Sequence, residues 1–232
     1  MLKRKLNKHE RVAIILFGCI AVILIVSYIR YGSDKDTDWL VYADSLDEVA
    51  ADVNGQDITL RDMAFYIAYD EMKVEEQAEI YNPEDTSRYW NVATNGVFLR
   101  VISKKSVMDK AIHDEIFYRM AVEENIELTD EDEQEIADAQ NLFWNSIMYG
   151  DKLEKLGVTE EDLNNTIRKI DIAQKYQSIY AKEHNKAMED YDNDSEDYKA
   201  LLEENEYHIH DDVWDRVHYG EITLEHIKGI YN

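Results

Sequence analysis

The spacing of hydrophobic and polar residues predicts a series of long helices in most of the chain after residue 50. Between Leu60 and Met72, apolar residues recur every three or four positions, which is the spacing of one helix face. Thr59 precedes this stretch and has an aspartate three residues later, the arrangement of a capping box. The same spacing follows Thr129 and Thr159. The pattern predicts helices over about 60–81, 97–124, 130–150 and 160–185.

Shorter segments predict a turn and two strands around these helices. Asn82-Pro83 is typical of a helix start, and we expect a short helix or turn from there through Trp90. The turn Asn54-Gly55 lies between extended-prone residues. A second short strand is predicted over 220–224. We expect it to pair with the strand near residue 53 and to close the helical domain with a small sheet.

Residues 12–29 are a continuous apolar stretch without a charge. As a helix at 1.5 Å per residue, the stretch covers about 27 Å, close to the thickness of a bilayer core. A cleaved signal peptide and a lipoprotein signal ending at Cys19 are the alternatives. The bulky Phe17 and the ten apolar or uncharged residues that follow Cys19 argue against the lipoprotein. We therefore predict an uncleaved transmembrane helix.

The charges that flank this stretch predict its orientation and the organisation of the rest of the chain. Residues 1–11 carry five Lys and Arg, whereas acidic residues dilute the two basic residues on the other side. The positive-inside rule places 1–11 in the cytoplasm as a short stub and the bulk of the chain outside the cell. Beyond the anchor we expect an acidic tether (30–49), a helical domain (50–185), and an acidic linker with a closing segment (186–232).

Composition excludes several classes of protein. The net charge of −25 argues against nucleic-acid binding and disfavours adhesion to anionic lipid headgroups. The chain has one cysteine, which excludes an intrachain disulfide. One proline and eight glycines favour long helices over an all-β fold. The fold class is therefore mainly α, with one transmembrane helix, a multi-helix domain, and a small β pairing of the N- and C-terminal segments.

Two groups of residues have a weak likeness to metal sites. Asp192, Asp194, Glu196 and Glu203 have the spacing of an EF-hand loop, but Asp197 occupies the position that needs glycine. The spacing of four histidines near the end fits no zinc motif, namely His208, His210, His218 and His226. We predict no metal and no cofactor. No serine elbow or glycine-rich phosphate loop is present in the sequence, so we predict no catalytic residue.

Aromatic residues are frequent, with 16 Tyr and four Trp. Tyr and Trp offer large amphipathic surfaces and are enriched where proteins bind other chains. Core packing is one interpretation of the aromatic residues in the first helical hairpin, and a groove for polypeptides is the other. The candidate polypeptide-binding residues are Tyr66, Tyr69, Tyr81, Tyr89 and Trp90.

Several stretches, taken in order, resemble the SurA and PrsA class of extracytoplasmic chaperones. They are VNGQDIT before the first helix, Tyr89-Trp90-Asn91 before the long helix, the run from Ala111 to Glu135, and the run from Leu156 to Tyr176. The match covers about 50–183. It implies a helical domain like the N-terminal domain of SurA and the C-terminal domain of trigger factor, which binds unfolded or secreted polypeptides.

The chain departs from many members of this class after the last matched helix. Only residues 186–232 follow, fewer than the roughly 100 of an ordinary domain. The resemblance therefore implies no parvulin domain and no prolyl isomerase activity. We expect a membrane-anchored, non-catalytic, chaperone-like protein outside the cell, held in the lipid bilayer by 12–29. A structural or adaptor protein with one specific partner is the second hypothesis. An extracellular enzyme or calcium-binding protein is the third.

Overall fold

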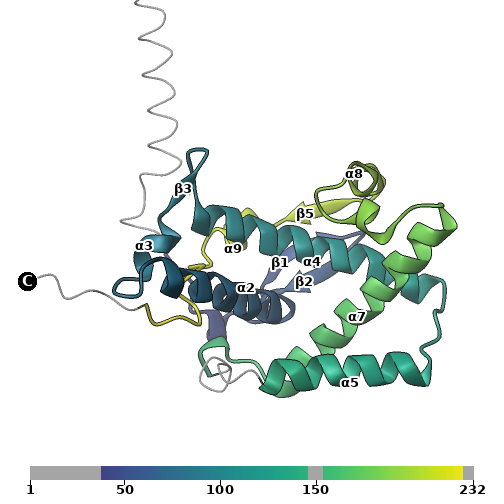
Figure 1. The fold of residues 1–232 in the computed structure, drawn as a ribbon, viewed down its shortest axis with the longest axis horizontal. Helices are drawn as coiled ribbons and strands as arrows, with labels where there is room; N and C mark the ends of the chain where they lie inside the picture. The colour runs from purple at the N-terminus through teal and green to yellow at the C-terminus, as the bar shows by residue number, and fades with distance from the viewer. Residues whose placement is uncertain (1–37, 146–153, 227–232) are drawn as a thin grey trace, which may run out of the picture. The chain divides into compact units, whose positions relative to one another are not determined.

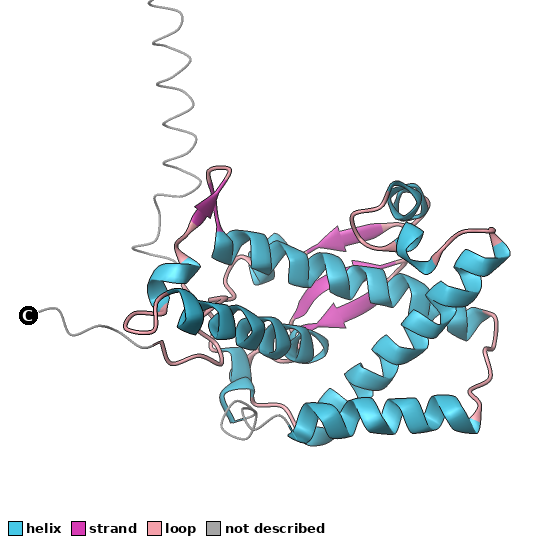
Figure 2. Ribbon diagram, viewed as in Figure 1, coloured by secondary structure: helices cyan, strands magenta, loops and turns pink. Residues whose placement is uncertain are grey.

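The computed structural model describes residues 38–145 and 154–226. The predicted anchor, 12–29, lies outside the described residues. Within the two described ranges, no helix combines the length and the apolar character needed to cross a bilayer. The described part is mainly helical, with small antiparallel sheets, as the sequence predicts (Figures 1 and 2).

Four long helices form most of the domain, and they match the four predicted ones to within a few residues wherever their ends are described. They are α2 (Leu60–Tyr81), α4 (Leu99–Glu123), α5 (Asp130–Asn145) and α7 (Glu160–Glu183). The predicted end of the third helix, at about 150, lies outside the described residues. The short helices are η1 (Tyr42–Asp44), α3 (Ser87–Trp90), η2 (Met188–Tyr191), α8 (Glu196–Glu203) and α9 (Asp211–Trp214).

The predicted capping boxes explain where these helices begin. The Thr59 hydroxyl accepts the Asp62 N–H at 3.3 Å, and Asp62 Oδ2 accepts the Thr59 N–H at 2.8 Å. The same pair of hydrogen bonds joins Thr159 to Asp162, and Thr129 to the aspartate three residues later. Each box satisfies N–H groups that the first helical turn leaves without a partner. The sequence prediction of these starts is confirmed.

The main sheet has three antiparallel strands in the order β2-β1-β5. β1 (Val49–Val53) and β2 (Gln56–Thr59) form a hairpin around Asn54-Gly55, whose φ angles are +50° and +76°. β5 (Tyr207–Ile209) pairs with the other edge of β1. A second hairpin, β3 (Ala93–Thr94) and β4 (Val97–Phe98), leads directly into α4. The predicted pairing of an N-terminal with a C-terminal segment is therefore confirmed.

The predicted C-terminal strand was assigned to the wrong residues. Residues 220–224 form no strand, because the N–H groups of Gly220, Ile222 and Thr223 point to the buried Glu71 of α2 instead of to a neighbouring strand. Glu71 Oε1 accepts the Gly220 N–H at 2.7 Å, and Oε2 accepts the Thr223 N–H at 2.8 Å. A Cβ on Gly220 would lie 2.9 Å from the ring of Trp90, so this close approach requires glycine. The segment, which we call the C-terminal strap (219–224), is held by side-chain capping.

The short helix after α2 also begins later than Asn82-Pro83 predicts. Residues 83–86 form turns, and α3 begins at Ser87. Asp85 stabilises this turn, since it accepts the Ser87 hydroxyl at 2.6 Å and pairs with Arg88 Nε at 2.8 Å. These bonds hold the pKa of Asp85 below its ordinary value, with the serine hydroxyl as the largest cause. The aspartate fixes the start of α3.

Helices α2, α4 and α7 share one hydrophobic core with β1 and β2. Figure 1 shows α2 and α4 in front of the strands, with α7 crossing beside them and α5 along the outer side of α7. Phe117 of α4 and Leu163 of α7 are completely buried in this core. α5 packs against α7, where Trp144 Nε1–H donates to Asn164 Oδ1 at 2.8 Å, and a space remains between α5 and α2. This space is the candidate site.

Candidate functional site

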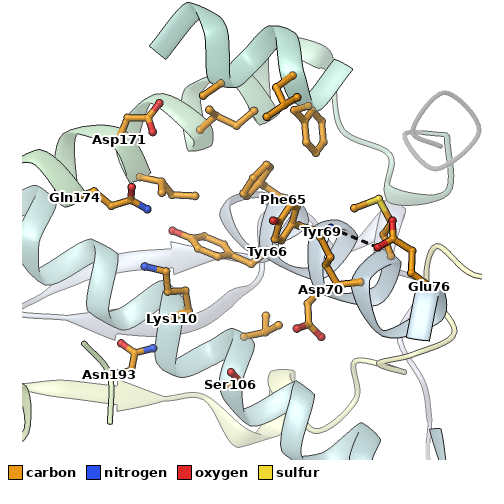
Figure 3. Close-up of a pocket in the computed structure, with 18 residues that line it drawn as sticks. Phe65, Tyr66, Tyr69, Asp70, Glu76, Ser106, Lys110, Asp171, Gln174 and Asn193 are labelled. Atoms are coloured by element: carbon orange, nitrogen blue, oxygen red, sulfur yellow. Dashed lines mark hydrogen bonds and ion pairs between the residues drawn. The ribbon is translucent and has the colours of Figure 1, made fainter. Parts of the chain in front are cut away.

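A groove of about 690 Å³ opens between α2, α4, α5 and α7. Its walls are mainly apolar, as Figure 3 shows around the three labelled aromatic side chains of α2. The apolar lining residues are Phe65, Tyr66, Tyr69, Met72, Val107, Ala139, Leu142, Phe143, Ile167 and Ile170. The volume is in the range of sites that bind drug-sized ligands.

Aromatic rings of α2 and α5 form the centre of the groove. The Phe65 ring stacks on Tyr69 with centroids 5.8 Å apart and lies 5.1 Å from the Phe143 ring. Tyr69 is 46% exposed and Leu142 is 75% exposed, although both are large hydrophobic residues. Exposed aromatic and aliphatic surface of this kind is typical of binding sites. The groove therefore presents apolar surface that a ligand can cover.

A buried polar cluster holds one side of the groove in place. Asp114 of α4 is completely buried and accepts the Tyr66 hydroxyl at 3.2 Å. Lys110 Nζ lies 2.7 Å from the same carboxylate, and His113 Nδ1 lies 2.9 Å from it. Burial raises the pKa of Tyr66 well above its ordinary value, and the nearby Asp114 charge adds to the effect. Tyr66 is thus a fixed, neutral donor, and α2 and α4 are held together below the groove.

The cations that line the groove have acidic partners. Lys73 Nζ is 3.4 Å from Glu76 Oε2 and 5.7 Å from the centroid of the Tyr69 ring. Lys110 pairs with the buried carboxylate of Asp114. Both positive charges are therefore compensated within the protein, and neither gives the groove a net attraction for anions.

The acid Asp171 of α7 lines the groove without such compensation. Its Oδ2 is buried and has no hydrogen-bond partner among the described residues. Burial raises the pKa of Asp171 to about 6, and the negative charge of Glu135 on α5 adds to the rise. Figure 3 shows Asp171 next to Gln174 on the α7 wall. The groove thus combines aromatic surface with one carboxylate that a donor or a cation from outside would stabilise.

The structure brings only two of the five predicted binding residues together. Tyr66 and Tyr69 line the groove. Tyr81 and Tyr89 pack against each other with ring centroids 5.2 Å apart, and neither is among the groove-lining residues. Trp90 is buried in the core, where its Nε1–H donates to Glu75 at 2.9 Å. The first helical hairpin therefore holds aromatic residues in three separate environments.

Sequence reasoning missed the contributions of α5 and α7 to the groove. Clustering along the chain points only to the first hairpin, so it does not select Leu142 and Phe143, and a search for Tyr and Trp does not select Phe65 of α2. A signal was present in α7, whose Ile170 and Gln174 belong to a face of mixed polarity. A face of mixed polarity is typical of a partly buried helix, and both residues line the groove.

The acidic residues with EF-hand spacing form separate contacts. Asp192 Oδ1 accepts Gln177 Nε2 at 3.1 Å, and Glu196 pairs with Lys199 at 2.7 Å. Glu196 begins α8, so the segment is a capped helix start preceded by a short 3-10 helix. In the part of the chain that the structure describes, no three His, Cys, Asp or Glu side chains converge as they do around a metal ion.

Comparisons with known proteins do not identify the fold or the groove. No protein-family model matches the chain, and neither a curated protein nor a solved structure matches it. The fold and the site define the class of protein as a mainly helical domain that has small antiparallel sheets and an aromatic groove. Its function has to be argued from the groove and its charges.

Proposed function

We propose that this protein is a membrane-anchored, chaperone-like protein that binds extended or partly folded polypeptides outside the cell without transforming them. The observation that carries the proposal is the aromatic groove between α2, α4, α5 and α7, in which Tyr69 and Leu142 remain exposed. Apolar side chains of a client would be covered there and would be protected from aggregation with other chains.

The size and rigidity of the groove suit a short polypeptide segment. At about 690 Å³ the groove accommodates a few side chains rather than a folded domain. The buried contacts of Tyr66 with Asp114 fix the wall against which such side chains would pack. Since a preformed site loses less conformational entropy on binding, this fixed wall favours affinity.

The carboxylate of Asp171, which has no cationic partner among the described residues, would favour clients that carry a positive charge. A segment with an aromatic or aliphatic residue next to Lys or Arg would cover the ring of Tyr69 and bring a cation to Asp171. Arginine suits the site especially, because its guanidinium stacks on aromatic rings and pairs with carboxylates. The high negative charge of the whole chain, −25, adds long-range attraction for basic segments.

The placement outside the membrane is supported by the sequence. The apolar stretch 12–29 and the basic residues before it predict the anchor and its orientation. The resemblance to SurA and PrsA supports a polypeptide-binding role. A specific adaptor would use the same groove, so the range of bound sequences separates the two functions.

The proposal is tested with the full chain reconstituted in detergent micelles or nanodiscs. We expect wild-type protein to slow aggregation of an unfolded secreted protein and to bind many array peptides that combine aromatic with basic residues. Tyr69→Ala should weaken peptide binding by about 5- to 30-fold, the usual cost of losing a central aromatic contact.

Tyr81→Ala is the matched control, because Tyr81 is a more exposed tyrosine (63%) of the same helix and lies outside the groove. We expect Tyr81→Ala to bind peptides like the wild type. Equal losses in both variants, or no binding of unfolded peptides by the wild type, would contradict the proposal. Binding of one sequence alone would support the adaptor.

A further inference from the structure

Beyond the predicted anchor, one long stretch of this acidic chain contains no acidic residue. The chain has 50 Asp and Glu among 232 residues, yet none lies between Thr86 and Met108, where there are four Lys and Arg. The stretch includes the β3–β4 hairpin and the first turns of α4. A domain that repels anionic surfaces on average therefore has one segment that itself carries no negative charge.

The same region exposes a group of large apolar side chains. Val97 and Phe98 of β4 are 38% and 46% exposed, and Val101 and Ile102 at the start of α4 are 38% and 40% exposed. Arg100 lies between them in the sequence and is half-buried, and its buried Nε has no hydrogen-bond partner among the described residues. We call these five residues the hairpin face. Adjacent exposed apolar residues with a basic one are typical of surfaces that contact a bilayer interface.

Contacts place the hairpin face at the end of the domain where the chain enters from the predicted anchor. The Leu40 N–H donates to the Arg216 carbonyl at 3.1 Å. The next carbonyl, that of Val217, accepts Lys104 Nζ at 2.9 Å. Lys104 lies on α4 one turn after Val101. The entry point and the hairpin face are therefore linked through two hydrogen bonds and one turn of helix.

The part of the predicted tether (30–49) that precedes the described residues limits how far this end of the domain can move from the membrane. Residues 30–37 separate the predicted anchor from Asp38, and even fully extended they reach at most about 30 Å. A domain of this size is about 40 Å across. Because the tether is shorter than the domain, the end that receives the tether stays close to the bilayer.

We propose that the hairpin face rests on the outer surface of the membrane, with Phe98, Val101 and Ile102 at the boundary between headgroups and acyl chains. Arg100 would lie among the lipid phosphates. The inference depends on the anchor that belongs to the proposed function, and it adds a second contact between the protein and the lipid. Positive charge next to apolar side chains favours a bilayer with anionic lipid as the occupant.

The test uses the full chain with Cys19→Ser, which removes the only cysteine. Single cysteines at Phe98→Cys or Val101→Cys carry an environment-sensitive fluorophore. The matched control is Val122→Cys, an exposed valine (55%) about 30 Å further along the same helix. Vesicles contain phosphatidylcholine with about 30% phosphatidylglycerol, to give the negative surface charge that Arg100 would meet. Flotation of the vesicles measures anchoring separately.

We expect labels at 98 and 101 to shift to shorter emission wavelengths and to be quenched by lipid-borne quenchers. Their quenching by aqueous iodide should be several-fold weaker than that of the label at 122. If the protein floats with the vesicles but iodide quenches all three labels alike, the hairpin face does not rest on lipid, although the anchor stands. Failure to float overturns the anchor and the inference together. Protection that disappears when the protein is diluted in excess lipid assigns the face to a protein contact and overturns the inference.

Discussion

Binding of a lysine-containing peptide in the groove should depend on pH in a way that reports on one side chain. The perturbation is a change from pH 7.5 to pH 5, combined with Asp171→Asn. At the higher pH the carboxylate of Asp171 is ionised and attracts the lysine of the peptide. At the lower pH it is protonated, so the attraction is lost while the apolar contacts remain.

The magnitude follows from the raised pKa of Asp171, which is about 6 because of burial and the charge of Glu135. With this pKa, about 97% of the carboxyl is ionised at pH 7.5 and about 9% at pH 5. If binding of the cation requires the ionised form, affinity falls up to about tenfold. With the ordinary aspartate value of 3.8, about 94% would remain ionised at pH 5, and affinity would hardly change.

Fluorescence anisotropy titrations measure the affinity at both pH values. Two labelled peptides differ only at one position, where lysine is replaced by norleucine, which has a similar apolar stem and no charge. The wild type should lose affinity for the lysine peptide on acidification and should bind the norleucine peptide almost equally at both pH values. Asp171→Asn should bind both peptides alike, at the level of the wild type at pH 5.

A second variant tests the stated cause of the shift. Burial is the larger cause of the raised pKa of Asp171, and Glu135→Gln removes the negative charge that adds to it, so the midpoint of the pH dependence should move to lower pH. The reasoning is refuted if Asp171→Asn keeps the full pH dependence, or if the norleucine peptide loses as much affinity as the lysine peptide. Either result would place the titrating group elsewhere.

Two predictions concern the stability of the fold. Glu71→Ala should lower the free energy of unfolding in urea by about 3–5 kcal/mol, because the N–H groups of the C-terminal strap, including that of Thr223, lose their acceptor in the interior. Glu79 is an exposed acid of the same helix, and Glu79→Ala should change the free energy of unfolding by less than about 0.5 kcal/mol. Equal losses of stability in the two variants would show that Glu71 does not hold the strap. Gly157→Ala should lower the free energy of unfolding by about 2–3 kcal/mol, since the residue has a φ of +70° and a new Cβ would lie 2.6 Å from Ala43 Cβ. A thermal unfolding midpoint equal to that of the wild type would contradict this.

The long helices could be predicted from the sequence because their signals are local. The capping boxes at Thr59, Thr129 and Thr159 use residues three positions apart, and the apolar spacing of α2 lies within a few turns. No distant partner is needed to define such a start. The turn at Asn54-Gly55 was predictable for the same reason, since its left-handed backbone depends on the two residues themselves.

The C-terminal segment could not be assigned, because its structure depends on a partner 149 residues away in the sequence. An acid on the apolar face of α2 gives no indication that it caps the backbone at Gly220. The choice of Tyr207–Ile209 as the strand likewise depends on which residues reach the free edge of β1. Contacts between residues far apart in the sequence therefore determine both the structure of the C-terminal strap and the position of β5.

Only the α2 wall of the candidate site could be predicted, because its residues are grouped by local helical spacing. Tyr66 and Tyr69 share the face of α2 that meets the groove, and helical spacing groups them correctly. Trp90 is close in sequence to Tyr89, yet the turn held by Asp85 directs Trp90 into the core. Proximity along the chain therefore overestimated the aromatic surface of the hairpin. The opposite wall, on α5, depends on packing between helices that are far apart in sequence.

The average charge of the chain does not describe every part of its surface. A net charge of −25 predicts repulsion from anionic lipid, but the acid-free stretch lies beside Leu40, near the start of the described domain. Figure 1 shows α5, one wall of the groove, on the side of the domain away from the β3–β4 hairpin. If the hairpin face rests on the bilayer, this wall is directed away from the lipid, where clients approach. Substitutions in the groove such as Tyr69→Ala should therefore leave lipid quenching at Val101 unchanged, because the two surfaces share no side chain.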